Sequence, residues 1–342
     1  MSSGCPLNAF YQFILGKVPD LISTRQLLER MTRSVYMSLR PSILKVSAYF
    51  DVFDYPLTAE EIAFFMDREI PVTELKAVLD TLIEEQHLFR TGRFYALRDI
   101  PGLSERRING NIHAAELLGI ARKISRLLYQ FPYVRGIGVS GSLSKNYADD
   151  DSDIDYFVIT RTNRLWIART FMHFYKKWNF LTGRQHWYCM NYYVDEEALE
   201  IKEKNIFTAI ELITLLPVCG NGGLVQFFNA NNWATDLLPN YRHRIRTAED
   251  SGGSSRFKKL FEWLFNHRIG DWLDDLLRDL TTRRWQKKEA RGIRNAKGFT
   301  MSLKTGKHYS RPNPDMLQKK ILALYSAKLT EFSTHWQLEP ER

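Results

Sequence analysis

The sequence has few cysteines and no long apolar run, and both absences narrow the class of protein. Cys5, Cys189 and Cys219 are scattered and form neither a disulfide framework nor a zinc-binding pattern, and Cys189 is predicted to be a small core residue. No apolar run is long enough for a transmembrane helix, so no membrane contact is expected. The first residues also lack the basic and apolar regions of a secretory signal, and the predicted location is cytoplasmic.

Positive charge is concentrated in the last third of the chain. The formal net charge of the 342 residues is +9, and Arg256 to Lys320 contain 17 Lys or Arg against 7 Asp or Glu. Hydrophobic content of 44% is ordinary for a soluble protein that buries a core. A localised basic surface can attract nucleic acid, phosphorylated substrates or acidic partners.

Residues 134–159 are the most informative stretch. They are predicted to form a strand, a glycine-serine turn, a helical start, a polar loop and a second strand. Asp153 and Asp155 are two residues apart at the start of the second strand, so their carboxylates should point to one face. Divalent cations take oxygen ligands of this kind and commonly carry phosphates with them.

The turn supplies the complementary half of such a site. Gly141 allows the backbone to approach a ligand closely, the amides of the turn can bind an anion, and Ser142 adds a hydroxyl. Gly141-Ser142, ten intervening residues and then Asp153-Ile154-Asp155 resemble the signature of the polymerase-beta-type nucleotidyltransferase superfamily. The resemblance covers roughly residues 112–217.

The resemblance implies a nucleoside triphosphate held at Gly141 and Ser142, with Mg²⁺ or Mn²⁺ at Asp153 and Asp155. An acceptor would attack the α-phosphorus and pyrophosphate would leave. Lys145 could neutralise the leaving group, and Arg161 and Arg164 could contact the triphosphate. The acceptor is not written in the sequence: a small molecule or a protein is favoured, and RNA stays open because of the basic C-terminal region.

The strand predicted at residues 185–194 departs from the superfamily pattern. A third carboxylate is expected at its centre, where this chain has Asn191, which can offer a carbonyl oxygen to a metal but cannot act as a base. The enzyme could work with two carboxylates, Asp195 could supply the third, or the domain could bind nucleotide without turning it over. Glu211, inside an apolar helix, could pair with a basic residue of the site, and Lys307 and His308, in a predicted loop, are further candidates.

The predicted fold class is α/β (α+β), with a nucleotidyltransferase-type mixed sheet and flanking helices. We predict N-terminal helices at 1–40, a winged-helix-like module at 41–99, a nucleotidyltransferase domain at 100–250 and a basic helical domain at 256–342. The module is predicted from three helices followed by a hairpin, with a capping box at Thr58 to Glu61. Its third helix carries Lys76 with Glu74, Asp80, Glu84 and Glu85, and this net acidic face makes DNA an unlikely though possible partner.

Two readings other than an enzyme follow from the same residues. Asn191 and the module at 41–99 are consistent with a nucleotide-binding regulator of weak or no activity. An interaction scaffold with a relict site would not bind nucleotide at all.

Overall fold

The chain folds around one mixed sheet. The computed structural model describes residues 21–180, 187–243, 247–248, 254–294, 302–312 and 314–336, with the backbone alone at 21–33, 180, 191, 242–243, 312, 314–316 and 332–336. Within these ranges the strands are β1 (Phe89–Thr91), β2 (Phe94–Ala96), β3 (Val134–Val139), β4 (Asp155–Thr160), β5 (Cys189–Asp195), β6 (Leu216–Cys219), β7 (Leu303–Thr305) and β8 (Tyr309–Pro312). The mixed α and β class is as predicted.

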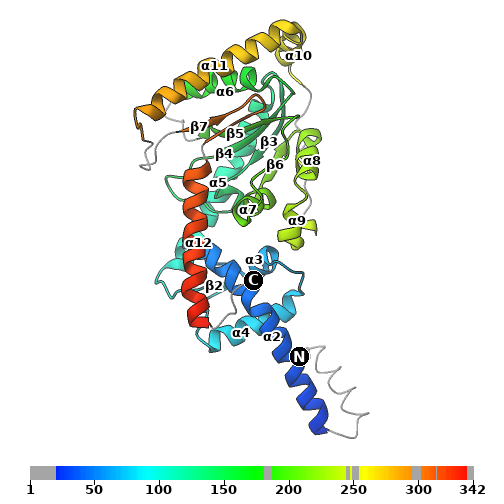
Figure 1. Ribbon diagram of the computed structural model, residues 1–342, viewed down its shortest axis with the longest axis vertical. Coiled ribbons are helices and arrows are strands. Elements are labelled where there is room, and N and C mark those ends of the chain that lie inside the picture. Colours follow the sequence, from blue (N-terminus) through cyan, green and yellow to red (C-terminus); the bar gives the residue numbers. More distant parts are fainter. Residues whose placement is uncertain are drawn as a thin grey trace.

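Helices cover both faces of the sheet, and further helices lie beyond it at both ends of the molecule (Figure 1). The α-helices in the described ranges are α2 (Leu21–Asp51), α3 (Ala59–Phe65), α4 (Val72–Glu84), α5 (Leu103–Tyr129), α6 (Leu165–Phe180), α7 (Ile206–Thr214), α8 (Asn221–Ala230), α9 (Ala234–Leu237), α10 (Arg256–Leu264), α11 (Arg268–Ala290) and α12 (Pro314–Trp336). Short 3-10 turns occupy η1 (Leu143–Lys145) and η3 (Pro239–His243). None of these helices is long and apolar enough to cross a bilayer.

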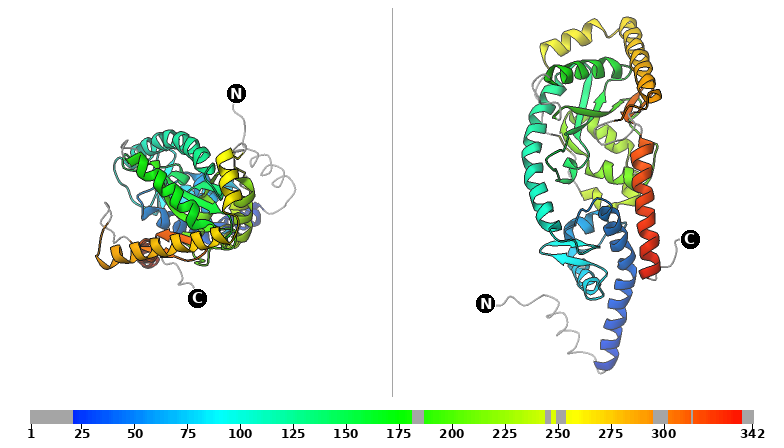
Figure 2. Two further views of the ribbon diagram at one scale, coloured as in Figure 1. Left: turned by 90° about the horizontal axis from the view of Figure 1, so that it is seen from above. Right: turned by 90° about the vertical axis from the view of Figure 1, so that its left-hand side faces the viewer.

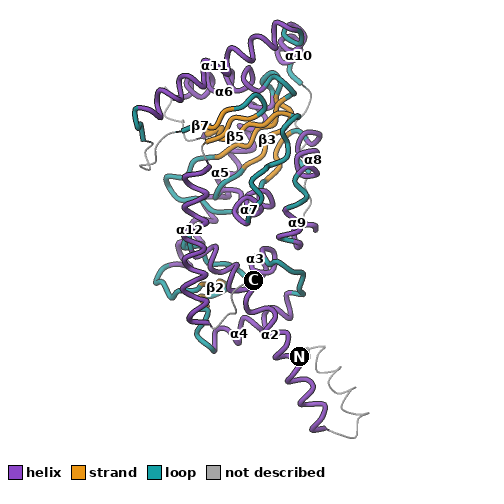
Figure 3. The backbone as a smooth tube through the Cα atoms, in the orientation of Figure 1, coloured by secondary structure: helices purple, strands orange, loops and turns teal. Residues whose placement is uncertain are grey.

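The central sheet has the strand order β6-β3-β4-β5-β8-β7. Its β4 and β5 are parallel, and the other neighbouring pairs are antiparallel. Along β4, Phe157 and Ile159 pack with α7 and α8 on one face, whereas Tyr156 and Val158 pack with α5 and α6 on the other. This period of two, with helices on both faces, explains why β4 is an apolar run after Asp155 (Figure 3).

The N-terminal helices and hairpin have the order predicted for residues 41–99. The capping box is confirmed, because Thr58 Oγ1 accepts from the Glu61 amide and Glu61 Oε2 accepts from the Thr58 amide. The expected boundary at residue 41 is absent, since α2 continues through Pro41 as one helix. Leu39 and Ile43, on either side of the proline, enter the same core, and that packing holds the helix together. Residues 1–20 of the predicted N-terminal helices lie outside the described ranges.

The N-terminal elements share a core with the sheet. Leu57 and Ile62 belong to the same buried cluster as Phe157 and Ile159. Arg107 of α5 is buried at this junction, where it pairs with Glu61 at 2.6 Å, donates to the Pro56 carbonyl at 2.8 Å and stacks on Tyr55. The boundary expected at residue 99 therefore does not separate two hydrophobic cores.

The C-terminal region differs from the predicted helical domain. Lys307 and His308 lie in a loop, as predicted, but this loop is the turn of a β7–β8 hairpin whose β8 pairs with β5 and extends the central sheet. The α12 helix then runs back to α2, where Tyr325 contacts Tyr49 and Lys328 pairs with Asp51 (Figure 2). The described residues between 302 and 336 thus add two strands to the central sheet and connect the sheet to α2. The sequence did not indicate these strands, because they are short and lack a strong apolar alternation.

The packing of α11 against α6 depends on a buried acid. Asp274 of α11 accepts a hydrogen bond from the Ile167 amide, at the start of α6, at 2.9 Å. Burial raises the pKa of the Asp274 carboxyl to about 7, against the lowering effect of these backbone hydrogen bonds. Its negative form is therefore costly in the folded protein.

Replacing Arg107 should destabilise the fold. Arg107→Ala leaves Glu61 and the Pro56 carbonyl without their buried donor, and we expect a loss of about 3 kcal/mol in the free energy of unfolding. Urea denaturation measures this loss. Lys123→Ala, on an exposed face of the same α5, is the matched control and should change stability by less than about 0.5 kcal/mol. Equal effects of the two substitutions would contradict the role of Arg107.

Asp274→Asn should alter the pH dependence of stability. Because the folded-state pKa is raised, folding takes up a proton, and the stability contributed by Asp274 is present at low pH and is lost as pH rises from about 4 to about 7. Asn keeps an acceptor for the Ile167 amide and cannot ionise. Urea unfolding should show the variant gaining roughly 1 to 3 kcal/mol over wild type between about pH 5 and about pH 8. If the stability difference between the variant and wild type were the same at about pH 5 and at about pH 8, the Asp274 carboxyl would not have a raised pKa.

Candidate functional site

The loop between β3 and β4 is closed at its base by the sheet. The Ser140 amide, directly after β3, donates to the Asp155 carbonyl at 2.9 Å. Gly141 follows with φ +70°, and its carbonyl accepts from Ser144 Oγ at 2.8 Å. The chain then turns through η1, which leaves Ser142 exposed. The predicted glycine-serine turn is thus a tight loop, and the helical start expected after it is the short 3-10 turn η1.

Gly141 lies against the carboxylate of Asp155. A Cβ atom added at Gly141 would come within 2.6 Å of Asp155 Oδ2. The positive φ favours glycine at this position, and a side chain there would displace the Asp155 carboxylate. The structure therefore brings the turn and the carboxylate together, as the motif predicts.

Asp153 and Asp155 lie close to a common point. Ile154 between them is fully buried, whereas both aspartates are partly exposed, so the alternation expected at the strand start is present. Cys189 is opposite Asp155 in the β4–β5 register, and burial together with the charges of Asp155 and Asp153 raises the pKa of its thiol to about 12. Both carboxylates are therefore near the Cys189 side chain, at the edge of the sheet where β4 and β5 begin.

The donor set suits a cation that brings its own ligands. In the described ranges no group of three or more His, Cys, Asp or Glu residues could hold a metal. Mg²⁺ commonly takes one or two protein carboxylates and completes its shell with water and substrate phosphate. Asp153 and Asp155 fit that requirement, and Mn²⁺ accepts the same oxygen donors.

Asn191 sits at an irregularity of β5. Met190 is opposite Tyr156 and Tyr192 is opposite Phe157, so the register shifts at Asn191. Such bulges redirect side chains and are frequent beside functional sites. The side chain of Asn191 lies outside the described residues, so its tentative role as a metal ligand stays a prediction.

Lys145 and Glu211 form an ion pair beside the loop. Lys145 Nζ lies 2.7 Å from Glu211 Oε1 and donates to the Gly141 carbonyl at 3.1 Å. The prediction that Glu211 pairs with a basic residue of the site is confirmed. Lys145 is therefore next to the turn, but its charge is already matched by a carboxylate.

Residues that the sequence did not single out hold this loop in place. Tyr55, from the N-terminal elements, donates its hydroxyl to the Lys145 carbonyl at 2.6 Å. Asn111 of α5 donates to the Asn146 carbonyl at 2.5 Å, and the Ala148 amide donates to the Gly110 carbonyl at 3.0 Å. No sequence signal marks Tyr55, because it lies 90 residues before Lys145. Gly110, within a helix, is the one available hint, since a side chain there would strike Tyr147.

Arg161 and Arg164 lie at the opposite end of β4. The strand runs from Asp155 to Thr160, which spans about 16 Å at the usual rise. Arg164 is buried and binds Asp271 at 2.5 Å and the Phe265 carbonyl at 3.2 Å. The prediction that these arginines contact phosphates at Gly141 is therefore wrong. Arg164 instead anchors α11, and Arg161 follows the far end of β4.

Asp195, Lys307 and His308 are also at that far end. Thr160 is opposite Asp195 in the register, and Asp195 is fully buried. Its Oδ2 accepts from the Asn163 amide at 2.9 Å and lies 2.9 Å from His308 Nδ1. Asp195 therefore joins three loops and is not the third carboxylate, while Lys307 is exposed in the β7–β8 turn.

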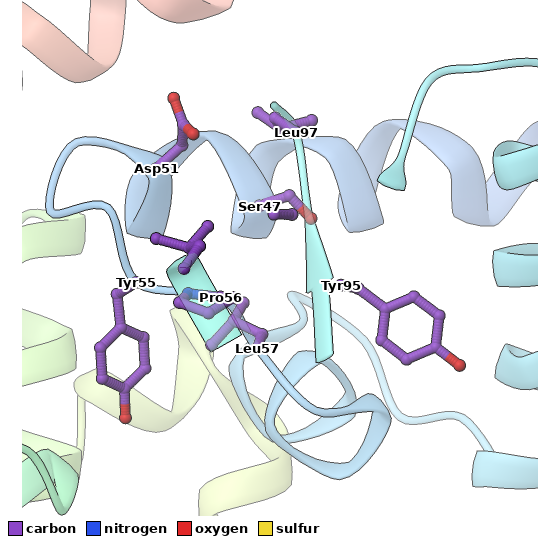
Figure 4. A pocket seen from close by; sticks show the side chains of 9 residues that line it. Ser47, Asp51, Tyr55, Pro56, Leu57, Tyr95 and Leu97 are labelled. Carbon is purple, nitrogen blue, oxygen red and sulfur yellow. The ribbon is translucent and has the colours of Figure 1, made fainter. Parts of the chain in front are cut away.

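A small cavity in the N-terminal elements does not offer an alternative site. Ser47, Asp51, Tyr55, Leu57 and Tyr95 contribute to its lining (Figure 4). Its volume of about 10 Å³ is room for about one water molecule, whereas ligand pockets occupy about 300 Å³ or more.

Comparison of the chain with protein-family models, with curated proteins and with solved structures gives no match.

Gly141→Ala should be more costly than a glycine substitution at a similar φ elsewhere. Gly92 has φ +61° with no heavy atom near an added Cβ, so Gly92→Ala measures the backbone strain alone, about 1 kcal/mol. Gly141→Ala adds the collision with Asp155, and we expect a total loss of roughly 2 to 4 kcal/mol. Urea denaturation of both variants tests this. Equal losses would show that the loop moves away from Asp155 without cost.

Proposed function

We propose that the chain is a nucleotidyltransferase that moves a nucleoside monophosphate from a nucleoside triphosphate to an acceptor and releases pyrophosphate. The observation that carries the proposal is the approach of Gly141 to the Asp155 carboxylate. It joins a glycine-serine turn, suited to phosphate oxygens, to a pair of carboxylates suited to Mg²⁺. A loop that served only to connect two strands would not need this contact.

Each residue of the site then has a defined task. The exposed turn at Gly141 and Ser142 would bind the phosphate tail through backbone and hydroxyl donors. Asp153 and Asp155 would hold Mg²⁺, which when bound neutralises charge on the phosphate oxygens. Lys145 would hold the turn in place by donating a hydrogen bond to the Gly141 carbonyl. When the triphosphate binds, the Lys145 ammonium would leave Glu211 and pair with a phosphate oxygen.

The transfer forms one bond and breaks another. An oxygen of the acceptor bonds to the α-phosphorus as the bond from that phosphorus to the bridging oxygen of pyrophosphate breaks. Asp195 cannot take the acceptor proton, because it is buried at the other end of the sheet. Asp153, Asp155 and Glu211 have carboxylates close to the turn and remain as candidates for this task. A small molecule or a protein side chain is the favoured acceptor, with RNA as the alternative.

A nucleotide-binding regulator of weak or no activity is the second candidate. The observation that favours it is the Tyr55 hydrogen bond to the Lys145 carbonyl, because it connects the winged-helix-like elements directly to the loop. Nucleotide binding at the loop could thereby be sensed by α2 to α4. The exposed side of α4 carries Glu74, Asp80 and Glu84, so a protein is a better partner for it than DNA.

Calorimetric titration tests the site before any acceptor is known. Each of the four ribonucleoside triphosphates is titrated with and without Mg²⁺, into wild type and Asp153→Asn. We expect Mg²⁺-dependent binding of at least one triphosphate and a loss of tenfold or more in the variant, roughly 1.4 kcal/mol or more of binding energy. Asp150→Asn is the control, because Asp150 lies in the same loop but is almost fully exposed and contacts His113.

The outcomes separate the candidates. Binding that Asp153→Asn leaves unchanged would refute the site. Binding lost in that variant, followed by transfer of labelled nucleotide to any acceptor, would support the enzyme. Binding without release of pyrophosphate under any condition would favour the regulator.

A further inference from the structure

Three helices form the outermost layer at the end of the molecule away from α2 to α4. Helices α6 and α11 lie side by side and run in the same direction, since Asp271 and Asp274 meet Arg164 and Ile167 at their N-terminal ends. Phe261 of α10 packs on Phe171 of α6 with ring centroids 4.9 Å apart. Figure 2 shows this layer from above, with α6, α10 and α11 facing outward.

The three helices expose several large apolar side chains. Trp178 of α6 is 75% exposed, Trp263 of α10 is 70% exposed and Trp272 of α11 is 64% exposed. Along α11, Ile269, Trp272, Leu276 and Leu280 recur at helical spacing and are all exposed, whereas Leu273 and Leu277 pack inward. An exposed apolar stripe of this kind marks a contact with another molecule or a membrane.

Basic side chains border the apolar ones. Exposed positive residues lie on α10 and on the second half of α11: Arg256, Lys259, Arg283, Arg284, Lys287 and Arg291. Most acidic residues of the same helices already have basic partners: Glu262 binds Arg135, Asp271 binds Arg164, and Asp275 and Asp279 bind Arg278 of α11, while Glu289 is exposed. The outer layer therefore combines exposed apolar groups with uncompensated positive charge.

The positive charges converge on a hollow beside α11. Leu280, Ile293 and the basic side chains between Arg283 and Arg291 line a space of about 540 Å³. Partial burial and the nearby charges of Arg284 and Lys177 lower the pKa of Lys288, which shows that cations from α6 and α11 crowd together here. Such crowding is unfavourable unless an anion occupies the hollow.

We propose that the outer layer of α6, α10 and α11 docks on the surface of an anionic lipid bilayer. The exposed tryptophans and leucines would enter the boundary between headgroups and acyl chains, as amphipathic interfacial helices do. The basic residues would bind lipid phosphates, and the hollow beside Leu280 would take a headgroup. Charge complementarity selects this occupant over a neutral surface. Docking in this way needs no spanning helix, so it revises the expectation of no membrane contact that was based on the absence of such a helix. It does not depend on nucleotidyl transfer.

Vesicle co-sedimentation of the full chain tests the proposal. One set of vesicles contains phosphatidylcholine alone, and the other contains equal parts of phosphatidylcholine and phosphatidylglycerol. We expect binding to the second set only, weakened by added salt. Trp263→Glu combined with Trp272→Glu should lower the partition coefficient roughly tenfold or more. Arg283→Gln combined with Lys287→Gln should lower it about twenty-fivefold, at about fivefold for each charge.

Matched variants on α5 control for the substitutions themselves. Ile112 and Lys123 are exposed there, away from the layer, so Ile112→Glu and Lys123→Gln should leave vesicle binding unchanged. Far-ultraviolet circular dichroism checks that each variant is folded. All positions in these variants are exposed, so loss of the fold is not expected.

Three outcomes would overturn the proposal. The first is no binding to either vesicle set. The second is binding that the layer variants do not reduce relative to the α5 variants. The third is a dimer in analytical ultracentrifugation that Trp263→Glu with Trp272→Glu dissociates, which would assign the layer to a second copy of the chain.

Discussion

The approach of the Gly141 backbone to the Asp155 carboxylate is the contact on which the candidate site depends. It favours glycine for two reasons at once, the positive φ and the missing Cβ. The Ser140 amide bound to the Asp155 carbonyl fixes the register that creates it. The geometry of the turn and the position of the carboxylate are thus a single structural feature, which is why both halves of the proposed site come from one loop.

The loop is also the place where distant parts of the chain meet. Arg107 of α5 holds the Tyr55 segment against α3, and Tyr55 in turn holds the loop at Lys145. Buried charge at Arg107 is costly unless its partners stay in place, so the pairing favours the observed arrangement of this junction. The N-terminal elements therefore support the loop physically, and any movement of α3 would be felt at the turn.

The two ends of the central sheet have different chemistry. At the Asp155 end, carboxylates are partly exposed next to an exposed turn, as a ligand site requires. At the other end, Asp195 and Arg164 are buried and satisfied by protein partners, so their charges serve the fold. The parallel pairing of β4 with β5 produces this division, because it sends the two strand termini of one polarity to the same edge.

The capping box and the motif follow from the amino-acid sequence alone. The capping box at Thr58 and the spacing of Gly141 and Asp155 depend on neighbouring residues, and local propensity and alternation are enough to predict them. The fold, in contrast, places Asp195, His308 and Arg164 away from the turn, supports the loop with Tyr55 and completes the sheet with β8. These relations join residues far apart in the chain, and strand order and direction, which set them, are not encoded in any short stretch of sequence.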